Sequence, residues 1–185
     1  MVPKIRPLLL FVTGTILFFV PMTTYGNDIN LDDWHKELSS IRSQFPEVTH
    51  ISTQELSAWL QDGERKSPIL IDVREKREYE VSHLPNAILI EPRRDPKNTE
   101  LINFDKNAEI VTYCSVGYRS AKLAKQLKRL GFQNVQNLEG SIFAWANEGR
   151  PLEIEGKQTS QVHPYNRYWK KYLKKHDMKT ARHPQ

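Results

Sequence analysis

The residues best suited to carry out a reaction lie in one segment, Cys-Ser-Val-Gly-Tyr-Arg, which runs from Cys114 to Arg119. The thiolate is the nucleophilic form of cysteine, and a lowered pKa makes the sulfur reactive near neutral pH. Gly117 permits positive φ or a close approach of the backbone, and Arg119 adds a permanent positive charge. A lone cysteine in an arbitrary protein is more often a small buried hydrophobe. Here the strand, loop and helix around Cys114, and the match of its loop described below, favour nucleophilic chemistry. A disulfide with a partner is a third alternative.

The residues around this segment predict a strand, a loop and a helix. Residues 110–112, Ile-Val-Thr, are typical of the end of a buried strand, and apolar residues recur at helical spacing over residues 121–130. Gly131 is placed to end that helix. We therefore expect residues 114–119 to form a short loop at the positive end of the helix, with backbone N–H groups directed at the thiol. Such a field favours the thiolate and attracts anions.

The segment Cys-Ser-Val-Gly-Tyr-Arg-Ser resembles, at every defined position, the active-site loop of the rhodanese domain, Cys-x-x-Gly-x-Arg-[Ser/Thr]. This resemblance implies that Cys114 carries a persulfide and that the loop amides hold the outer sulfur or the thiosulfate anion. Cdc25-type phosphatases and arsenate reductases are similar, but their loop is one residue longer, which makes room for a tetrahedral oxyanion. The shorter loop of this chain therefore favours sulfur transfer. The predicted substrate-binding residues are Ser115, Val116, Gly117, Tyr118 and Arg119.

Two further segments resemble rhodanese signatures. Residues 72–87 resemble Asp-x-Arg-x-x-x-Glu-[Tyr/Phe]-x-x-Gly-His-Ile-Pro-Gly-Ala, with departures at Ser82 and Asn86. Residues 139–145 resemble Glu-Gly-Gly-x-x-x-Trp, with Ser141 in place of the second glycine, where we expect it to cap a helix. The resemblance implies an α/β fold: a doubly wound parallel sheet of about five strands with helices on both faces.

Three charged residues of the first of these segments, Asp72, Arg74 and Glu78, have two interpretations. Asp72 follows a buried strand, so it would lie on the same sheet edge as the Cys114 loop and could act in catalysis. Alternatively, the three residues form an ion-pair and hydrogen-bond network that supports the neighbours of the loop. We favour this second, supporting role, because perturbed charges often belong to structural networks.

Hydrophobic patterning predicts the remaining elements of the sheet and its helices. Residues 91–107 form a polar crossover, where Arg93 and Arg94 either line the entrance for the anion or are solvated. The further predicted helices cover residues 31–45 and 53–60. The further predicted strands cover residues 49–51, 68–73, 87–90 and 135–138.

The 185 residues divide into four parts. Residues 1–26 have basic residues, an apolar run and small residues in the order of a secretory signal peptide, so we expect export to a bacterial periplasm. The alternative is an uncleaved membrane anchor with the protein facing the periplasm. Residues 27–48 form an N-terminal helical extension, residues 49–152 the rhodanese domain, and residues 153–185 a basic aromatic tail.

Charge is concentrated in the tail. The net charge is +5, but residues 27–156 carry 17 basic and 21 acidic residues, so the folded body has no nucleic-acid signature. Tyr165, Trp169 and Tyr172 recur at helical spacing. They predict either an amphipathic helix on an anionic membrane surface or a partner, or an aromatic face packed on the domain, which we favour.

The predicted function is that of a thiosulfate sulfurtransferase. The resemblance implies that a Cys114 persulfide passes sulfane sulfur from a small sulfur anion to cyanide or a thiol acceptor, and it implies neither a metal nor an organic cofactor. A non-catalytic persulfide carrier, or a sulfide- or redox-sensing module, is the alternative. A phosphatase or arsenate reductase is less favoured because of the loop length.

Overall fold

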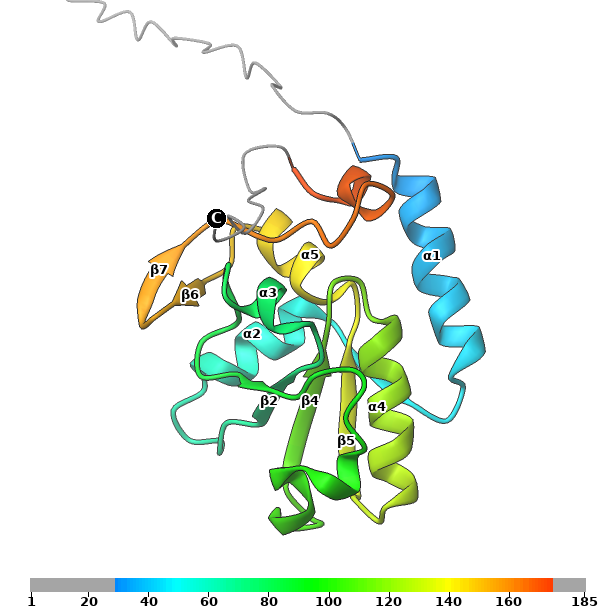
Figure 1. Ribbon diagram of the computed structural model, residues 1–185, viewed down its shortest axis with the longest axis vertical. Helices are drawn as coiled ribbons and strands as arrows, with labels where there is room; N and C mark the ends of the chain where they lie inside the picture. Colours follow the sequence, from blue (N-terminus) through cyan, green and yellow to red (C-terminus); the bar gives the residue numbers. More distant parts are fainter. Residues whose placement is uncertain (1–28, 175–185) are drawn as a thin grey trace, which may run out of the picture.

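A parallel five-stranded sheet in the order β1-β5-β4-β2-β3 forms the centre of the computed structural model, which describes residues 29–174 (Figure 1). This sheet confirms the predicted fold class. The signal peptide expected at residues 1–26 lies outside the described residues, as do residues 175–185. The strands are β1 (Thr49–Ile51), β2 (Ile69–Asp72), β3 (Ile88–Leu89), β4 (Glu109–Tyr113) and β5 (Asn134–Leu138).

Helices cover both faces of the sheet. On one face, α4 packs against β4 and β5, and the end of α1 lies beside α4, where the rings of Phe45 and Tyr118 are 5.4 Å apart. On the opposite face α2 packs against α5. No helix within residues 29–174 has the length and apolar character that a membrane span requires. The helices are α1 (Leu31–Gln44), α2 (Thr53–Gln61), α3 (Lys76–Tyr79), α4 (Tyr118–Arg129) and α5 (Ser141–Asn147).

Local sequence signals explain where several of these elements begin and end. The predicted capping box at the start of α2 is present: Ser52 Oγ accepts the N–H of Glu55, and the Glu55 carboxylate accepts the N–H of Ser52. Gly131 follows the end of α4 with a φ of 91°, as expected of a C-terminal glycine. The crossover before β4 contains two 3₁₀ turns, Pro96–Asn98 and Glu100–Asn103.

The strand register places the candidate site at one edge of the sheet. Asp72, the last residue of β2, is in register with Tyr113, the last residue of β4. Cys114 directly follows Tyr113. Because all five strands are parallel, their carboxyl ends meet at this edge, where open α/β sheets bind ligands.

The chain beyond α5 packs back on the domain. A two-stranded antiparallel sheet, β6 (Leu152–Ile154) and β7 (Lys157–Thr159), precedes a 3₁₀ turn at Trp169–Tyr172. Tyr172 is buried, and its ring lies 5.1 Å from that of Trp34 on α1. Asn147, at the end of α5, donates to the carbonyl oxygen of Tyr172 at 2.8 Å. These contacts match the packing that we favoured for the aromatic residues, and a helix from Tyr165 is not formed.

At Gly140, the N-cap of α5, helix α1 packs closely against the start of α5. Its φ is 67°, in the left-handed region that favours glycine. A Cβ atom at this position would lie 2.6 Å from the Cβ of Ala144 and 2.9 Å from Cζ2 of Trp34. The close approach of α1 to α5 therefore depends on a missing side chain.

We predict that Gly140→Ala lowers the free energy of unfolding by about 2–4 kcal/mol, from backbone strain and steric overlap together. The control is Gly63→Ala, because a Cβ at Gly63 meets no heavy atom within 4 Å and its φ is not positive. We expect the control to change stability by less than about 1 kcal/mol. Urea unfolding of both variants checks this, and equal effects would contradict the proposed contact.

Candidate active site

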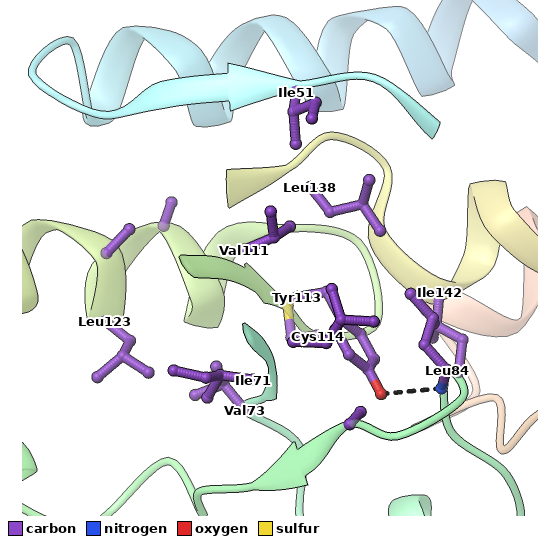
Figure 2. Packing of buried hydrophobic residues seen from close by; sticks show 14 of the residues in the cluster. Ile51, Ile71, Val73, Leu84, Val111, Tyr113, Cys114, Leu123, Leu138 and Ile142 are labelled. Atoms are coloured by element: carbon purple, nitrogen blue, oxygen red, sulfur yellow. Dashed lines mark hydrogen bonds between the residues drawn. The ribbon is translucent and has the colours of Figure 1, made fainter. Parts of the chain in front are cut away.

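Cys114 lies at the carboxyl end of β4, within the packed core. Its side chain is 1% exposed, and Figure 2 shows it beside Tyr113 among apolar side chains. Burial alone disfavours a thiolate, because a charge loses its hydration in an apolar environment. The chemistry of the sulfur therefore depends on the polar groups that reach it.

Hydrogen-bond donors at the start of α4 lie beside the sulfur. The N–H of Gly117 donates to Sγ of Cys114 over 3.2 Å. Ser120 contributes its backbone N–H and its hydroxyl. The same hydroxyl lies 3.2 Å from the carbonyl oxygen of Gly117, so rotation of one O–H bond directs its proton to either acceptor. Helix α4 also begins earlier than predicted, so Tyr118 and Arg119 belong to the helix and not to the loop.

These donors outweigh burial and lower the pKa of Cys114. Burial raises the pKa, while the positive charge of Arg119 and the hydrogen bonds from Ser120 and Gly117 favour the thiolate and bring the pKa below its ordinary value. Ser120 was not among the predicted site residues, although it occupies the last position of the Cys-x-x-Gly-x-Arg-[Ser/Thr] pattern. That pattern was the signal that could have identified it.

The backbone at Gly117 curls around the sulfur. Its φ is 123°, and a Cβ atom there would lie 3.4 Å from Nδ2 of Asn137. Glycine thus provides both the positive φ and the close approach to β5 that the sequence predicted.

Glu78 ties the loop to the segment after β2. Its carboxylate accepts hydrogen bonds from both terminal nitrogens of Arg119, at 2.8 and 2.9 Å, and from the hydroxyl of Ser115 at 2.9 Å. The side chain of Glu78 is fully buried. Burial raises its pKa, but the hydrogen bonds and charge of Arg119 prevail and lower it. Arg119 is thereby held in place by a carboxylate, with its positive charge still acting on Cys114.

Asp72 and Arg74 form a second, separate pair. Arg74 donates to Asp72 through Nε at 2.9 Å and through a terminal nitrogen at 2.7 Å, and both side chains are fully buried. The same terminal nitrogen donates to the carbonyl oxygen of Ser82 at 2.5 Å. The hydroxyl of Tyr113 accepts the N–H of Leu84 at 3.0 Å, drawn as a dashed line in Figure 2. This pair fixes the turn after α3 to the strand ends, whereas Glu78 holds the loop itself.

Ser141 has a different role from the predicted helix cap. Gly140 is the N-cap of α5, and Ser141 is the first helical residue, with a φ of 50°. Its hydroxyl oxygen accepts the N–H of Cys114 at 3.1 Å, and the hydroxyl donates to the carbonyl oxygen of Leu138 at 3.0 Å. Residues 142 and 143 donate their N–H groups to the carbonyl oxygens of Cys114 and Ser115. The start of α5 therefore fixes the backbone of the loop.

The other predicted loop residues direct their side chains elsewhere. Val116 is buried in the apolar core, and the ring of Tyr118 packs on Phe45. Their backbone N–H groups remain the part of these residues that we predict to bind the anion. Within residues 29–174, no cluster of three or more His, Cys, Asp or Glu side chains could hold a metal ion.

The chain after β7 adds a wall to the site that the sequence did not reveal. The guanidinium carbon of Arg119 lies 4.5 Å from the centre of the Tyr165 ring. His163 is 7% exposed, and it lies close enough to Glu78 and Arg74 to feel their charges. Burial lowers the pKa of His163, which favours its neutral form. Tyr165 follows with a φ of 60°.

Curated proteins resemble part of this chain in sequence. A tRNA uridine(34) hydroxylase from Erwinia tasmaniensis is 33% identical over 116 residues, which make up 58% of this chain and 32% of that protein. A protein of the same name from Escherichia coli is 31% identical over 135 residues, which make up 69% of this chain and 36% of that protein. The chain thus spans about a third of the length of the curated relatives it matches.

A solved structure and a family model also match this chain. The rhodanese-like domain protein from Staphylococcus aureus is 37% identical, with a TM-score of 0.51 over 59% of this chain and 100% of that one. The family model for the rhodanese-like domain matches residues 52–148, more than half of the chain. Those residues contain β2, the Cys114 loop and the start of α5, which together build the site. The chain belongs to the rhodanese-like domain family.

Proposed function

We propose that this protein is a sulfurtransferase that accepts sulfane sulfur on Cys114. The Cys114 thiolate attacks the outer sulfur of thiosulfate, the sulfur–sulfur bond of thiosulfate breaks, and sulfite leaves with the bonding electron pair. The product is a Cys114 persulfide. The observation that carries this proposal is a buried sulfur at the start of α4 that accepts the N–H of Gly117 at 3.2 Å, close to the positive charge of Arg119.

The same donors serve both halves of the reaction. N–H groups aimed at a sulfur anion stabilise charge as it develops, as in an oxyanion hole. In the second half an acceptor, cyanide or a thiolate, attacks the outer sulfur of the persulfide, and Cys114 leaves as a thiolate. Stabilisation of that thiolate by Gly117 and Ser120 makes it a better leaving group. No general base is needed once the thiolate is formed.

A persulfide carrier is the second candidate. A carrier would accept sulfur and release it to a protein partner and not to cyanide. The curated relatives bear the name of a hydroxylase, but this chain aligns with about a third of their length, so we do not extend hydroxylation to it. Export through residues 1–26, and contact of the basic tail with a membrane surface or a partner, remain part of the proposal.

We predict that Cys114→Ser lowers thiosulfate:cyanide activity by at least about a thousandfold, because the hydroxyl cannot form a persulfide. Mass spectrometry after incubation with thiosulfate should show one added sulfur on the wild type, removed by cyanide, and none on the variant. Circular dichroism is the control for folding. Substantial thiocyanate formation by the folded variant would refute the assignment. Sulfur that resists cyanide yet moves to a protein would indicate the carrier.

We predict that Glu78→Gln destabilises the protein by about 2–3 kcal/mol at neutral pH, since Arg119 and Ser115 lose their buried carboxylate. Because the pKa of Glu78 is lowered on folding, its stabilisation is complete above the ordinary carboxyl pKa of about 4.3 and is lost as the pH falls through the folded-state pKa. The difference between wild type and variant should therefore shrink in acid.

Urea unfolding over a series of pH values measures this difference. The matched control is Glu80→Gln, which removes an exposed carboxylate that lies 3.6 Å from Lys76. We expect the control to cost less than about 0.5 kcal/mol. A difference between wild type and Glu78→Gln that is independent of pH would show that the carboxylate charge does not hold the loop.

A further inference from the structure

A basic cavity adjoins the Cys114 loop on the side of Arg119. Its volume is about 650 Å³. Its charged lining consists of five cations, Lys76 and Arg77 on α3, Arg93 and Arg94 on the crossover and Arg119 on α4, and two carboxylates, Glu75 and Glu91. Tyr165, from the chain beyond the family-model match, forms another wall. We call this cavity the basic cleft.

Most charges of the basic cleft already have partners. Arg119 is held by Glu78, Arg77 by Glu75 at 2.8 Å, and Lys76 by Glu80 at 3.6 Å. Arg93 and Arg94 differ, because neither side chain forms an ion pair or hydrogen bond with the side chains that the structure describes. Both are exposed. They are the two cations of the cleft that are available to bind a ligand.

A second cavity, of about 560 Å³, shares Arg93, Arg94 and Arg119 with the basic cleft and adds Lys97 and Lys122 to its lining. Arg93 and Arg94 thus stand where two cationic cavities adjoin, beside the arginine that acts on Cys114. Cations outnumber carboxylates in the basic cleft by five to two, and such an excess of positive charge raises the local concentration of anionic ligands. The ligand predicted by this arrangement is an anion.

The volume of the basic cleft indicates how large its ligand is. Cavities of about 300–1,000 Å³ bury ligands of drug-like size. Thiosulfate and cyanide have only a few atoms, so neither needs such a volume. A thiol acceptor that carries several anionic groups would use both the space and the free guanidinium groups. Arginine binds carboxylates through paired, parallel N–H bonds, which suits a ligand with two carboxylates.

We propose that the basic cleft binds the sulfur acceptor, and that this acceptor is a small thiol with at least two carboxylates, held by Arg93 and Arg94. This inference rests on the proposed sulfurtransferase function. The acceptor thiolate passes Arg119, its sulfur bonds to the outer sulfur of the Cys114 persulfide, and the sulfur–sulfur bond to Cys114 breaks. The outer sulfur moves to the acceptor together with its proton, so the acceptor leaves as a protonated persulfide and Cys114 returns to the thiolate.

The test separates loading of Cys114 from discharge. The full-length protein is loaded with thiosulfate, freed of excess reagent and checked by mass spectrometry for one added sulfur. Discharge is then timed with mercaptosuccinate, which carries two carboxylates, and with 2-mercaptoethanol, which carries none. For Arg93→Ala/Arg94→Ala we expect the ratio of the two discharge rates to fall about tenfold. Succinate, which has no thiol, should compete with mercaptosuccinate in the wild type.

Two variants control for charge and folding. Lys36→Ala/Lys157→Ala removes the same charge from exposed sites outside the cleft and should keep the wild-type ratio. Arg93→Lys/Arg94→Lys retains the charge and should restore at least part of the ratio. An unchanged ratio in Arg93→Ala/Arg94→Ala, or an equal fall in the charge-matched control, would overturn the proposal. Failure of the wild type to take up sulfur would instead refute the proposed sulfurtransferase function.

Discussion

The ionisation of Cys114 depends on a balance between two effects. Burial of the sulfur opposes the thiolate, and nearby hydrogen-bond donors and a positive charge favour it. Cys114 is almost inaccessible to solvent, so its charge cannot be stabilised by water. Three neighbours, Gly117, Ser120 and Arg119, supply the compensating interactions. Because hydrogen bonds and charges act more strongly where water is excluded, small displacements of these groups would change the pKa of the sulfur.

The rest of the fold fixes the position of those neighbours. Glu78 holds Arg119 and Ser115, and Ser141 accepts the N–H of Cys114. Each comes from a different segment: Glu78 follows β2, and Ser141 begins α5. The approach of α1 to Gly140 secures the start of α5 in turn. Packing far from the sulfur therefore contributes to the chemistry through a short series of contacts.

Much of this architecture could be predicted from sequence because it follows local rules. The strand before Cys114, helix α4 and its end at Gly131 were read from hydrophobic spacing and one glycine. The supporting role of Asp72, Arg74 and Glu78 followed from their charge and their place after a strand, yet their division into two networks did not. Which guanidinium meets which carboxylate depends on side-chain directions that sequence spacing does not specify.

The roles of Ser141 and of the chain after β7 were harder to predict for the same physical reason. The hydroxyl of Ser141 meets a backbone N–H that is 27 positions earlier in the chain, and serine at a helix start normally serves its own helix. Tyr165, Trp169 and Tyr172 have helical spacing, but a positive φ at Tyr165 and contacts with Arg119 and Trp34 take precedence over local propensity. Tertiary contacts of this kind leave no periodic signal.

The pKa of the Cys114 thiol tests the central claim most directly. Cys114 is the single cysteine of the chain, so protein labelled with ¹³C at cysteine gives one Cβ resonance whose shift reports ionisation without chemical access to the buried sulfur. We expect a titration midpoint below the ordinary thiol pKa of about 8.5. A midpoint at or above that value would show that burial outweighs the donors, and it would contradict a preformed thiolate at this site.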